Sequence, residues 1–344
     1  MYKRVKIEDA VGKTLAHDIS EVDLSKNFKG VRFKKGHIIK EEEIEIFRQL
    51  GKEAVFVLEG ANEADIVHED DASIELAPLI AGSNIYYDRQ PSEGKIKFYA
   101  EIDGLLKIDR ERVIQINKLK IPSLPTKYGN VPVKKGDVVA AFRIIPLYCE
   151  KEVIENCKKI LNFPAISVKP YLHKKAGIIV TGNEFFTGRK KDSFTKKMID
   201  KLSDFGVDVI KHTILPDDVE IIANKISSYL TDVDLLLITG GTSVDPDDCT
   251  KKAVAYIGAS IVQEGSPLQP GNNFTFGYIQ EKIVCGVPAA SLFYKATALD
   301  IFLPRLLAGE KISADEVAAY SIGGLCYFCK ACVYPACPFG KAVC

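Results

Sequence analysis

The sequence predicts an α/β protein whose main part is a three-layer αβα domain built on a parallel-type sheet. Short apolar segments at 176–180, 207–215 and 234–239 alternate with amphipathic segments at 194–205 and 218–230. Strands that are apolar on both faces and alternate with amphipathic helices are typical of a parallel sheet covered on both sides. The length of 344 residues and the 47% hydrophobic content allow two or three domains with a large core.

Residues 1–60 predict a smaller α+β module at the N-terminus. Gly30 and Gly36 separate short apolar runs, as turns between strands do. Lys40–Leu50 has apolar residues at helical spacing, acidic residues in its first turn and a glycine directly after it. A strand is expected at Ala54–Leu58.

Residues 72–172 predict a β-containing middle segment. The preceding stretch, 60–71, is acidic and has no periodicity, so we expect a connection there. Within the middle segment the pattern favours helices at 110–119 and 151–161 and a strand at 138–145.

Charge and composition exclude several classes of partner. The chain has 46 basic and 46 acidic residues, so no net field attracts nucleic acid or a membrane surface, and the ligand is expected to be small. No apolar run approaches the roughly 18 residues that a spanning helix needs, and the start lacks the apolar core of a signal peptide. We therefore expect a cytoplasmic protein, in which its nine cysteines favour metal binding or free thiols over disulfides.

Polar loops follow the predicted strands of residues 173–310. Ligands bind beyond the carboxyl ends of parallel strands, where glycines let the backbone approach an anion and carboxylates hold a metal or orient a phosphate. The loops are Thr181-Gly182-Asn183-Glu184, Asp192-Ser193, Pro216-Asp217-Asp218 and Thr239-Gly240-Gly241-Thr242-Ser243.

Structural roles are open for the same residues. A glycine pair after a buried strand often makes only a tight turn, and Glu184 can be a solvated loop carboxylate. Asp217 and Asp218 can simply cap the next helix, and Ser193 is expected to cap the helix at 194–205.

Taken in order, these motifs resemble the molybdopterin-binding domain shared by molybdopterin adenylyltransferases and molybdopterin molybdenumtransferases. The resemblance covers 175–309 and continues through Asp248, Thr250, Pro270-Gly271-Asn272-Asn273 and Cys285-Gly286-Val287-Pro288 to a helix expected at 289–307. The segment 10–19 is also similar to the start of the molybdenumtransferases, which favours that branch.

The resemblance implies a pocket for molybdopterin, or its adenylate, whose phosphate lies against the Gly240-Gly241 loop. In such a transferase molybdate displaces AMP, and Mg²⁺ bridges the phosphate to carboxylates. Glu184, Asp217 and Asp218 would be catalytic. The positions implied to bind the cofactor are Thr181, Gly182, Asp192, Ser193, Gly240, Gly241, Thr242, Ser243, Asp248, Pro270 and Gly271. Implied partners are molybdate and a molybdoenzyme or biosynthetic protein, and the N-terminal module and middle segment offer surfaces for a homodimer.

Departures from the family pattern favour an alternative in which the pterin is bound but not converted. Phe28–Phe33 stands near the place of the family's Ser-Ala-Met-Asp-Gly-Tyr, Asn272-Asn273 replaces a basic residue, and 245–248 adds acidic residues. The protein would then be a non-catalytic carrier or sensor of the pterin. A third interpretation is a nucleotide-processing enzyme of the competence-damage type, because the glycine loop can equally receive a nucleotide phosphate.

The tail at 320–344 carries a second signal, Cys326-x2-Cys329-x2-Cys332-x4-Cys337-Pro338, with Cys344 at its end. Three thiolates in succession, each two residues from the next, favour a [4Fe–4S] cluster over Zn²⁺, which usually takes two separated Cys-x2-Cys pairs. Cys344 can replace Cys337 as fourth ligand, and zinc or unligated redox-active thiols stay open. The other cysteines are expected to be buried packing residues.

Overall fold

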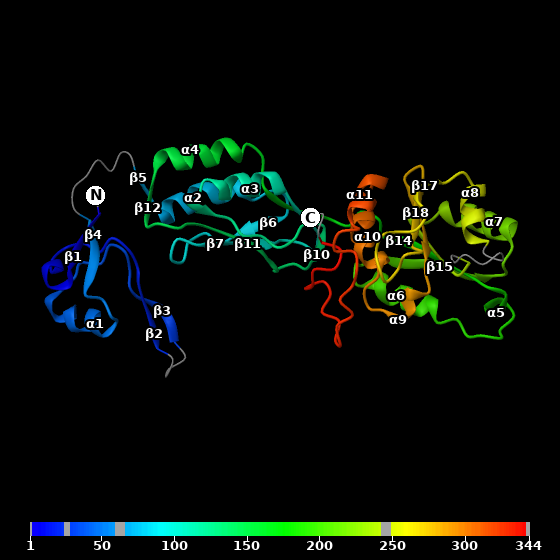
Figure 1. Ribbon diagram of the computed structural model, residues 1–344, viewed down its shortest axis with the longest axis horizontal. Coiled ribbons are helices and arrows are strands. Elements are labelled where there is room, and N and C mark those ends of the chain that lie inside the picture. The colour runs from blue at the N-terminus through cyan, green and yellow to red at the C-terminus, as the bar shows by residue number, and fades with distance from the viewer. Residues whose placement is uncertain (1, 24–27, 59–65, 242–248, 342–344) are drawn as a thin grey trace.

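The computed structural model describes all residues except 1, 24–27, 59–65, 242–248 and 342–344. Figure 1 shows the N-terminal module, a middle domain and a C-terminal α/β domain following one another along the longest axis. The cysteine-rich tail, drawn in red, lies where the middle and C-terminal domains meet. Within the described parts of the chain, no helix combines the length and apolar character that crossing a membrane requires.

The N-terminal module has its own small core. Strands β1 (Tyr2–Lys6) and β4 (Ala54–Leu58) pair antiparallel, as do β2 (Ile19–Asp23) and β3 (Phe28–Phe33). The helix expected at 40–50 is divided into the 3-10 turns of η2 (Glu41–Glu43) and the short α1 (Ile44–Gln49), because the Glu43 carboxylate accepts the backbone N–H of Lys40 at 2.9 Å and tightens the first turn. A further 3-10 turn, η1, spans Ile7–Ala10.

The middle domain places helices over small antiparallel sheets (Figure 1). Its helices are α2 (Glu69–Ile80), α3 (Arg110–Lys118) and α4 (Lys151–Ile160). One sheet has the order β6-β7-β11-β9, a second has β10-β8-β13, and β5 pairs with β12. Their bounds are β5 Ile66–His68, β6 Ile85–Tyr87, β7 Ile96–Ala100, β8 Gly104–Ile108, β9 Pro122–Ser123, β10 Val131–Val133, β11 Val138–Ile144, β12 Tyr148–Glu150 and β13 Ile166–Lys169.

The expectation that residues 60–71 form a connection is wrong for the last part of that stretch. Strand β5 begins at Ile66, and α2 begins at Glu69 inside the acidic stretch. Carboxylates in the first turn of a helix interact favourably with its free N–H groups, so the acidic residues start this helix. His68 Nδ1 accepts the backbone N–H of Asp70 at 3.1 Å and caps it.

The C-terminal domain is built on a six-stranded sheet in the order β15-β14-β16-β19-β18-β17. Strands β14 (Lys175–Thr181), β15 (Asp208–Leu215), β16 (Leu235–Thr239) and β19 (Lys282–Val287) run parallel. Two further strands extend the sheet beyond β19: β18 (Thr275–Ile279) pairs antiparallel with β19, and β17 (Ser260–Gln263) pairs antiparallel with β18.

Helices cover both faces of this sheet. On one face, α6 (Phe194–Ser203), α10 (Ala298–Leu307) and α11 (Ala314–Ala319) pack over a core that includes Ile178. On the other face, α7 (Val219–Leu230) and α8 (Thr250–Tyr256) pack over a core that includes Ile179. Successive strand residues point to opposite faces, so the two neighbours enter different cores. The predicted three-layer αβα class is confirmed.

The single helix expected at 289–307 is wrong. The chain forms the short α9 (Ala290–Phe293), leaves helical geometry at Tyr294 with φ −104° and ψ 140°, and starts α10 only at Ala298. The reason is a capping box: the Asp300 carboxylate accepts the backbone N–H of Thr297 at 2.8 Å, which defines a new helix start. The break leaves Tyr294 outside helical geometry, between α9 and α10.

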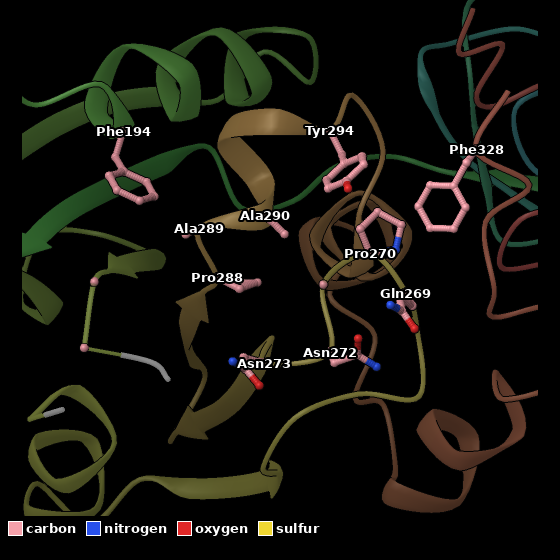
Figure 2. A pocket seen from close by; sticks show the side chains of 13 residues that line it. Phe194, Gln269, Pro270, Asn272, Asn273, Pro288, Ala289, Ala290, Tyr294 and Phe328 are labelled. Carbon is pink, nitrogen blue, oxygen red and sulfur yellow. The ribbon is translucent and has the colours of Figure 1, made fainter. Parts of the chain in front are cut away.

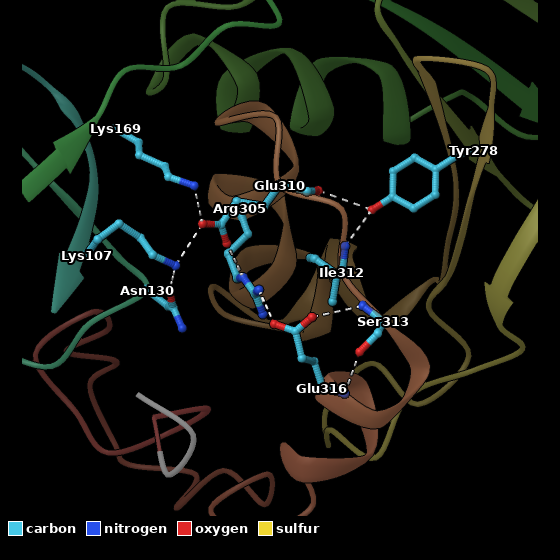
Figure 3. Close-up of polar contacts among 9 residues, drawn as sticks. All are labelled: Lys107, Asn130, Lys169, Tyr278, Arg305, Glu310, Ile312, Ser313 and Glu316. Atoms are coloured by element: carbon cyan, nitrogen blue, oxygen red, sulfur yellow. Dashed lines mark hydrogen bonds and ion pairs between the residues drawn. The ribbon is translucent and has the colours of Figure 1, made fainter. Parts of the chain in front are cut away.

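A buried ion network joins the middle domain to the C-terminal domain (Figure 3). The Glu310 carboxylate lies 2.7 Å from Lys107 Nζ and 3.0 Å from Lys169 Nζ, both on middle-domain strands. It also accepts the Nε–H of Arg305 at 2.7 Å, and Arg305 donates to Glu316 at 2.5 Å. The arginine and Glu310 are both buried, so the junction depends on their mutual charge compensation.

Candidate functional site

The parallel strands of the C-terminal sheet all end at one edge, and the predicted loops follow those ends. Gly182 follows β14, Pro216 follows β15, Gly240 follows β16 and Pro288 follows β19. From β14 the chain first pairs β15 on one side and then β16 on the other. Such a reversal of direction opens a crevice at the carboxyl ends of the central strands. The Gly240-Gly241 turn lies at this crevice.

The Gly240-Gly241 turn is tightly packed against its neighbours. Both residues have positive φ, 90° and 52°. A Cβ on Gly240 would lie 2.1 Å from the backbone oxygen of Thr181, so only glycine fits. Thr250 Oγ1 donates to the Gly240 oxygen at 2.9 Å and lies 3.3 Å from Thr181 Oγ1. The two threonines therefore hold the loops after β14 and β16 together.

A cavity of about 500 Å³ opens beside this turn (Figure 2). Its walls come from the Gly240-Gly241 turn, the segment 269–273, the segment 288–290 after β19, and three aromatic rings. The rings belong to Phe194 at the start of α6, to Tyr294 in the break after α9, and to Phe328 in the tail.

The chemistry of the walls suits a flat, polar heterocycle carrying an anionic group. Gln269, Asn272 and Asn273 supply side-chain amides, and no charged side chain lines the cavity among the described residues. Aromatic faces provide apolar contact for a ring system, while amides and backbone N–H groups fix its orientation. An anion would meet the backbone of the glycine turn instead of a lysine or arginine.

The sequence-derived site residues fall into groups. Gly240, Gly241, Pro270 and Gly271 line the cavity. Thr181 and Gly182 are buried beside it and shape the turn. Thr242, Ser243 and Asp248 lie outside the described residues.

Two of the predicted carboxylates stabilise helix starts. Asp192 Oδ1 accepts the backbone N–H groups of Phe194 at 2.7 Å and Thr195 at 3.1 Å. Asp218 Oδ1 accepts the N–H of Ile221 at 2.9 Å and caps α7. The expectation that Ser193 caps α6 is wrong: its backbone is already helical, at φ −109° and ψ −8°, and it makes no side-chain cap, so the capping position moves to Asp192.

Asp217 and Glu184 lie at the same edge of the sheet. Asp217 Oδ2 accepts the N–H of Asn183 at 3.0 Å, and Asn183 Oδ1 accepts the N–H of Asp217 at 3.3 Å, so the loops after β14 and β15 are tied together. Glu184, in the short α5 (Asn183–Phe186), folds back over Gly182, where a Cβ would lie 2.9 Å from its Oε2. Its carboxylate accepts no hydrogen bond from another described residue, which leaves it available to a ligand.

The tail cysteines line a second cavity of about 610 Å³, next to the first. Cys326, Cys329, Cys332 and Cys337 all contribute to its wall. Among the described residues, no three His, Cys, Asp or Glu side chains converge closely enough to hold a single metal ion. Tyr294 and Phe328 belong to both cavities.

Sequence reasoning missed the aromatic and amide walls of the first cavity. Gln269, Asn272 and Asn273 adjoin or lie within the proline-glycine motif, so their position was a usable signal. Phe194, Tyr294 and Phe328 come from three separate elements, and only the folded chain brings them together. The position of Tyr294 could not be predicted because this residue lies within the helix expected at 289–307.

The fold and the cavity define a class: an α/β domain with a small-ligand pocket at the carboxyl ends of parallel strands. Residues 177–308 match the family described as a probable molybdopterin binding domain. The C-terminal domain of this chain is therefore similar to the molybdopterin-binding domains that this family model describes. Residues 4–59, the N-terminal module, match a domain of unknown function (DUF8806).

The chain is similar to curated proteins of more than one kind. A protein of Methanocaldococcus jannaschii named for molybdopterin biosynthesis is 27% identical over 54% of this chain and 46% of its own length. A CinA-like protein of Fervidobacterium nodosum is 30% identical over 37% of this chain and 31% of its own. A molybdopterin molybdenumtransferase of Haemophilus influenzae is 24% identical over 59% of this chain and 51% of its own. The chain thus spans about half, or less, of the length of these relatives.

Among solved structures, the molybdopterin biosynthesis enzyme MoaB of Thermus thermophilus is similar with a TM-score of 0.32 and 17% sequence identity. The similarity covers 40% of this chain and 98% of that protein.

Proposed function

We propose that this protein acts in molybdenum cofactor biosynthesis by binding adenylylated molybdopterin and exchanging its AMP for molybdate. The observation that carries the proposal is the meeting of the Gly240-Gly241 turn with Pro270-Gly271 in one cavity. These motifs come from different parts of the family segment and are nearly 30 residues apart in the chain. The match of residues 177–308 to a probable molybdopterin binding domain supports the pterin as ligand.

The two parts of the substrate suit different walls of the cavity. The pterin ring would contact the aromatic side chains, two of which, Tyr294 and Phe328, are partly exposed and meet edge to face at 6.0 Å. The phosphate would lie at the glycine turn, where a backbone with positive φ and no Cβ lets N–H groups approach an anion. Asn273 would supply an amide between these ends.

The carboxylates present at the edge fit a Mg²⁺ ion that is shared with the substrate. Mg²⁺ usually keeps several waters and takes one or two protein carboxylates together with substrate phosphates, so it needs no complete protein cage. Glu184, whose carboxylate has no partner among the described residues, would hold the ion, and Asp217 would hold the neighbouring loop through Asn183. When bound, the ion would neutralise charge on the phosphate that leaves with AMP.

A carrier or sensor of the pterin is the second candidate. The described wall of the cavity has no charged side chain, and Asp192, Asp217 and Asp218 all accept backbone N–H groups. A site of this kind binds a ligand without supplying much charge to the reaction. A nucleotide-processing role, suggested by the CinA-like relatives, would place a nucleotide phosphate at the same turn.

One assay separates the candidates. The purified protein is incubated with adenylylated molybdopterin, molybdate and Mg²⁺, and AMP release is followed by chromatography. We expect AMP release that depends on molybdate. Tight pterin binding without release of AMP would show that the protein is a carrier or sensor of the pterin. Binding of free nucleotides in place of the pterin would instead favour the nucleotide-processing enzyme.

Glu184→Gln is expected to lower AMP release by roughly 100-fold or more, because the amide keeps the shape of the side chain but loses its affinity for the cation. The free energy of unfolding should be unchanged, since the carboxylate has no partner in the described structure. Glu220→Gln, the same substitution at an exposed position in the first turn of α7, is the matched control. Equal activity of both variants would remove Glu184 from the mechanism.

Asp218→Asn tests the capping role that the geometry gives this residue. Asparagine caps helices about as well as aspartate, so stability and AMP release should stay close to those of the unmodified protein. A loss of AMP release as large as that of Glu184→Gln, with the protein still folded, would instead make Asp218 part of the reaction site.

A further inference from the structure

The tail cysteines form one group in space as well as in sequence. Cys326, Cys329, Cys332 and Cys337 line the cavity of about 610 Å³, together with Lys295. All of them are free thiols in the structure. No substrate role is assigned to this cavity, and nothing in the molybdopterin site requires four cysteines beside it.

The backbone between the first two cysteines is shaped around a sulfur atom. Phe328 has a φ of 50°, a left-handed conformation that a phenylalanine rarely adopts. In this conformation its backbone N–H donates to Cys326 Sγ at 3.4 Å. Hydrogen bonds to sulfur are a regular feature of thiolate-ligated metal centres, whose properties they tune. Such a conformation is unfavourable for a residue other than glycine, so its presence indicates a local constraint on the backbone at Phe328.

The spacing of the cysteines in the sequence favours a cluster over a single ion. Tetrahedral zinc with bonds of about 2.3 Å brings its sulfur ligands to within about 3.8 Å of one another. The four cysteines of this segment instead line one common cavity and include three in succession, each two residues from the next. A cube of iron and sulfide fits within this cavity and takes one thiolate at each iron. Lys295 in the wall would offset part of its negative charge.

The segment is fixed at its ends and exposed in its middle. Tyr334 OH donates to the Asp300 oxygen at 2.8 Å, and Phe339 is buried in the main core. Between these anchors and Cys326 the side chains are open: Tyr327 is 74% exposed and Phe328 is 52% exposed. A metal centre bound by the cysteines would therefore restrain the part of the tail that the protein core does not.

The same segment contacts the pterin site directly. Cys326 N–H donates to the Gln269 oxygen at 2.8 Å, and Gln269 N–H donates to the Gly324 oxygen at 2.8 Å. Gln269 immediately precedes Pro270-Gly271, and both Gln269 and Phe328 line the first cavity (Figure 2). Phe328 also lines the second cavity. The position of the tail thus decides the shape of one side of the ligand pocket.

We propose that Cys326, Cys329, Cys332 and Cys337 hold a [4Fe–4S] cluster, and that its assembly closes the adjoining ligand pocket by fixing Phe328 and Gln269. The protein then binds the pterin tightly only when the cluster is present. The cluster site does not depend on the proposed function. The coupling, meaning the effect of the cluster on pterin binding, rests on the proposed function.

The cluster is tested on the full chain, purified anaerobically or reconstituted anaerobically with ferric iron, sulfide and a thiol that reduces part of the iron. We expect a brown protein with about four iron and four sulfide per chain and, after reduction, a paramagnetic signal. Cys329→Ser or Cys332→Ser should abolish the signal. Cys149→Ser, which removes a thiol in the middle domain, should retain it. A colourless protein with stoichiometric zinc, or full iron content in the serine variants, would overturn the assignment.

The coupling is tested by measuring molybdopterin affinity with and without the cluster. We expect the cluster-free protein to bind roughly 10-fold more weakly. Phe328→Gly keeps the left-handed turn and should keep the cluster, but it removes the shared ring, so its affinity should be low in both states. Equal affinities of loaded and cluster-free unmodified protein overturn the coupling. Failure of both forms to bind molybdopterin overturns the coupling and the proposed function together, while iron content still reports on the cluster.

Discussion

Replacing Gly240 with alanine will abolish ligand binding and destabilise the C-terminal domain by about 3 kcal/mol or more. Gly240 has a φ of 90°, where alanine is strained, and an added Cβ would lie 2.1 Å from the Thr181 oxygen. The strand end cannot move away, because Thr181 is buried and Thr250 Oγ1 holds the Gly240 oxygen at 2.9 Å. The loops after β14 and β16 must therefore separate, and the pocket loses one wall.

The prediction is checked by urea unfolding together with a pterin-binding measurement. Gly258→Ala is the matched control in the same domain: its φ is also positive, 75°, but nothing lies within 4 Å of an added Cβ. That control should lose only the roughly 1–2 kcal/mol that a left-handed conformation costs alanine, and it should bind the pterin normally. If both variants lost the same stability and bound ligand equally, close packing of the glycine turn would not explain the site.

The C-terminal sheet could be predicted because local and global signals agree there. Segments such as Leu235–Thr239 are short, apolar throughout and alternate with amphipathic helices, which favours parallel strands covered on both faces. The polar loops after parallel strands are then expected at one edge of the sheet. The roles of single carboxylates could not be predicted. An aspartate such as Asp192 or Asp218 has the same carboxylate whether it caps a helix or binds an ion. Its role depends on the residue at which the helix begins, and the sequence does not give that start to within one residue.

Helix α2 shows a different limit of sequence reasoning. Its buried residues follow helical spacing, but that face includes Glu69 and Ser73, so the apolar signal is weak. Both polar groups are satisfied by distant partners: Glu69 accepts from Arg143 at 2.9 Å, and Ser73 Oγ donates to the Gly94 oxygen at 2.6 Å. Partners of this kind become visible only in the folded chain. The same is true of Phe328, which reaches the ligand pocket from a tail whose sequence signals only metal binding.

Glu310→Gln is expected to lower the free energy of unfolding by about 3 kcal/mol at neutral pH, because it leaves three cations without their shared carboxylate. Burial by itself would raise the pKa of Glu310, but hydrogen bonds from Lys107, Arg305 and Lys169 outweigh it and lower the pKa from 4.5 to about 2. The ionised form is thus favoured in the folded protein. Glu281→Gln, which affects an 86%-exposed partner of Lys311, is the control and should change stability by no more than about 1 kcal/mol.

The pH dependence of stability follows from the direction in which folding shifts the pKa of Glu310. Because the folded pKa of about 2 lies below the unfolded value of 4.5, the stabilisation is fully present above pH 4.5 and is lost as the pH falls toward 2. The difference between the unmodified protein and Glu310→Gln should therefore be constant near neutrality and shrink in acid, as followed by urea unfolding at each pH. Burial already lowers the pKa of Lys107, so loss of the carboxylate should lower it further. A difference that stayed constant down to pH 2 would mean that Glu310 acts through packing and not through its charge.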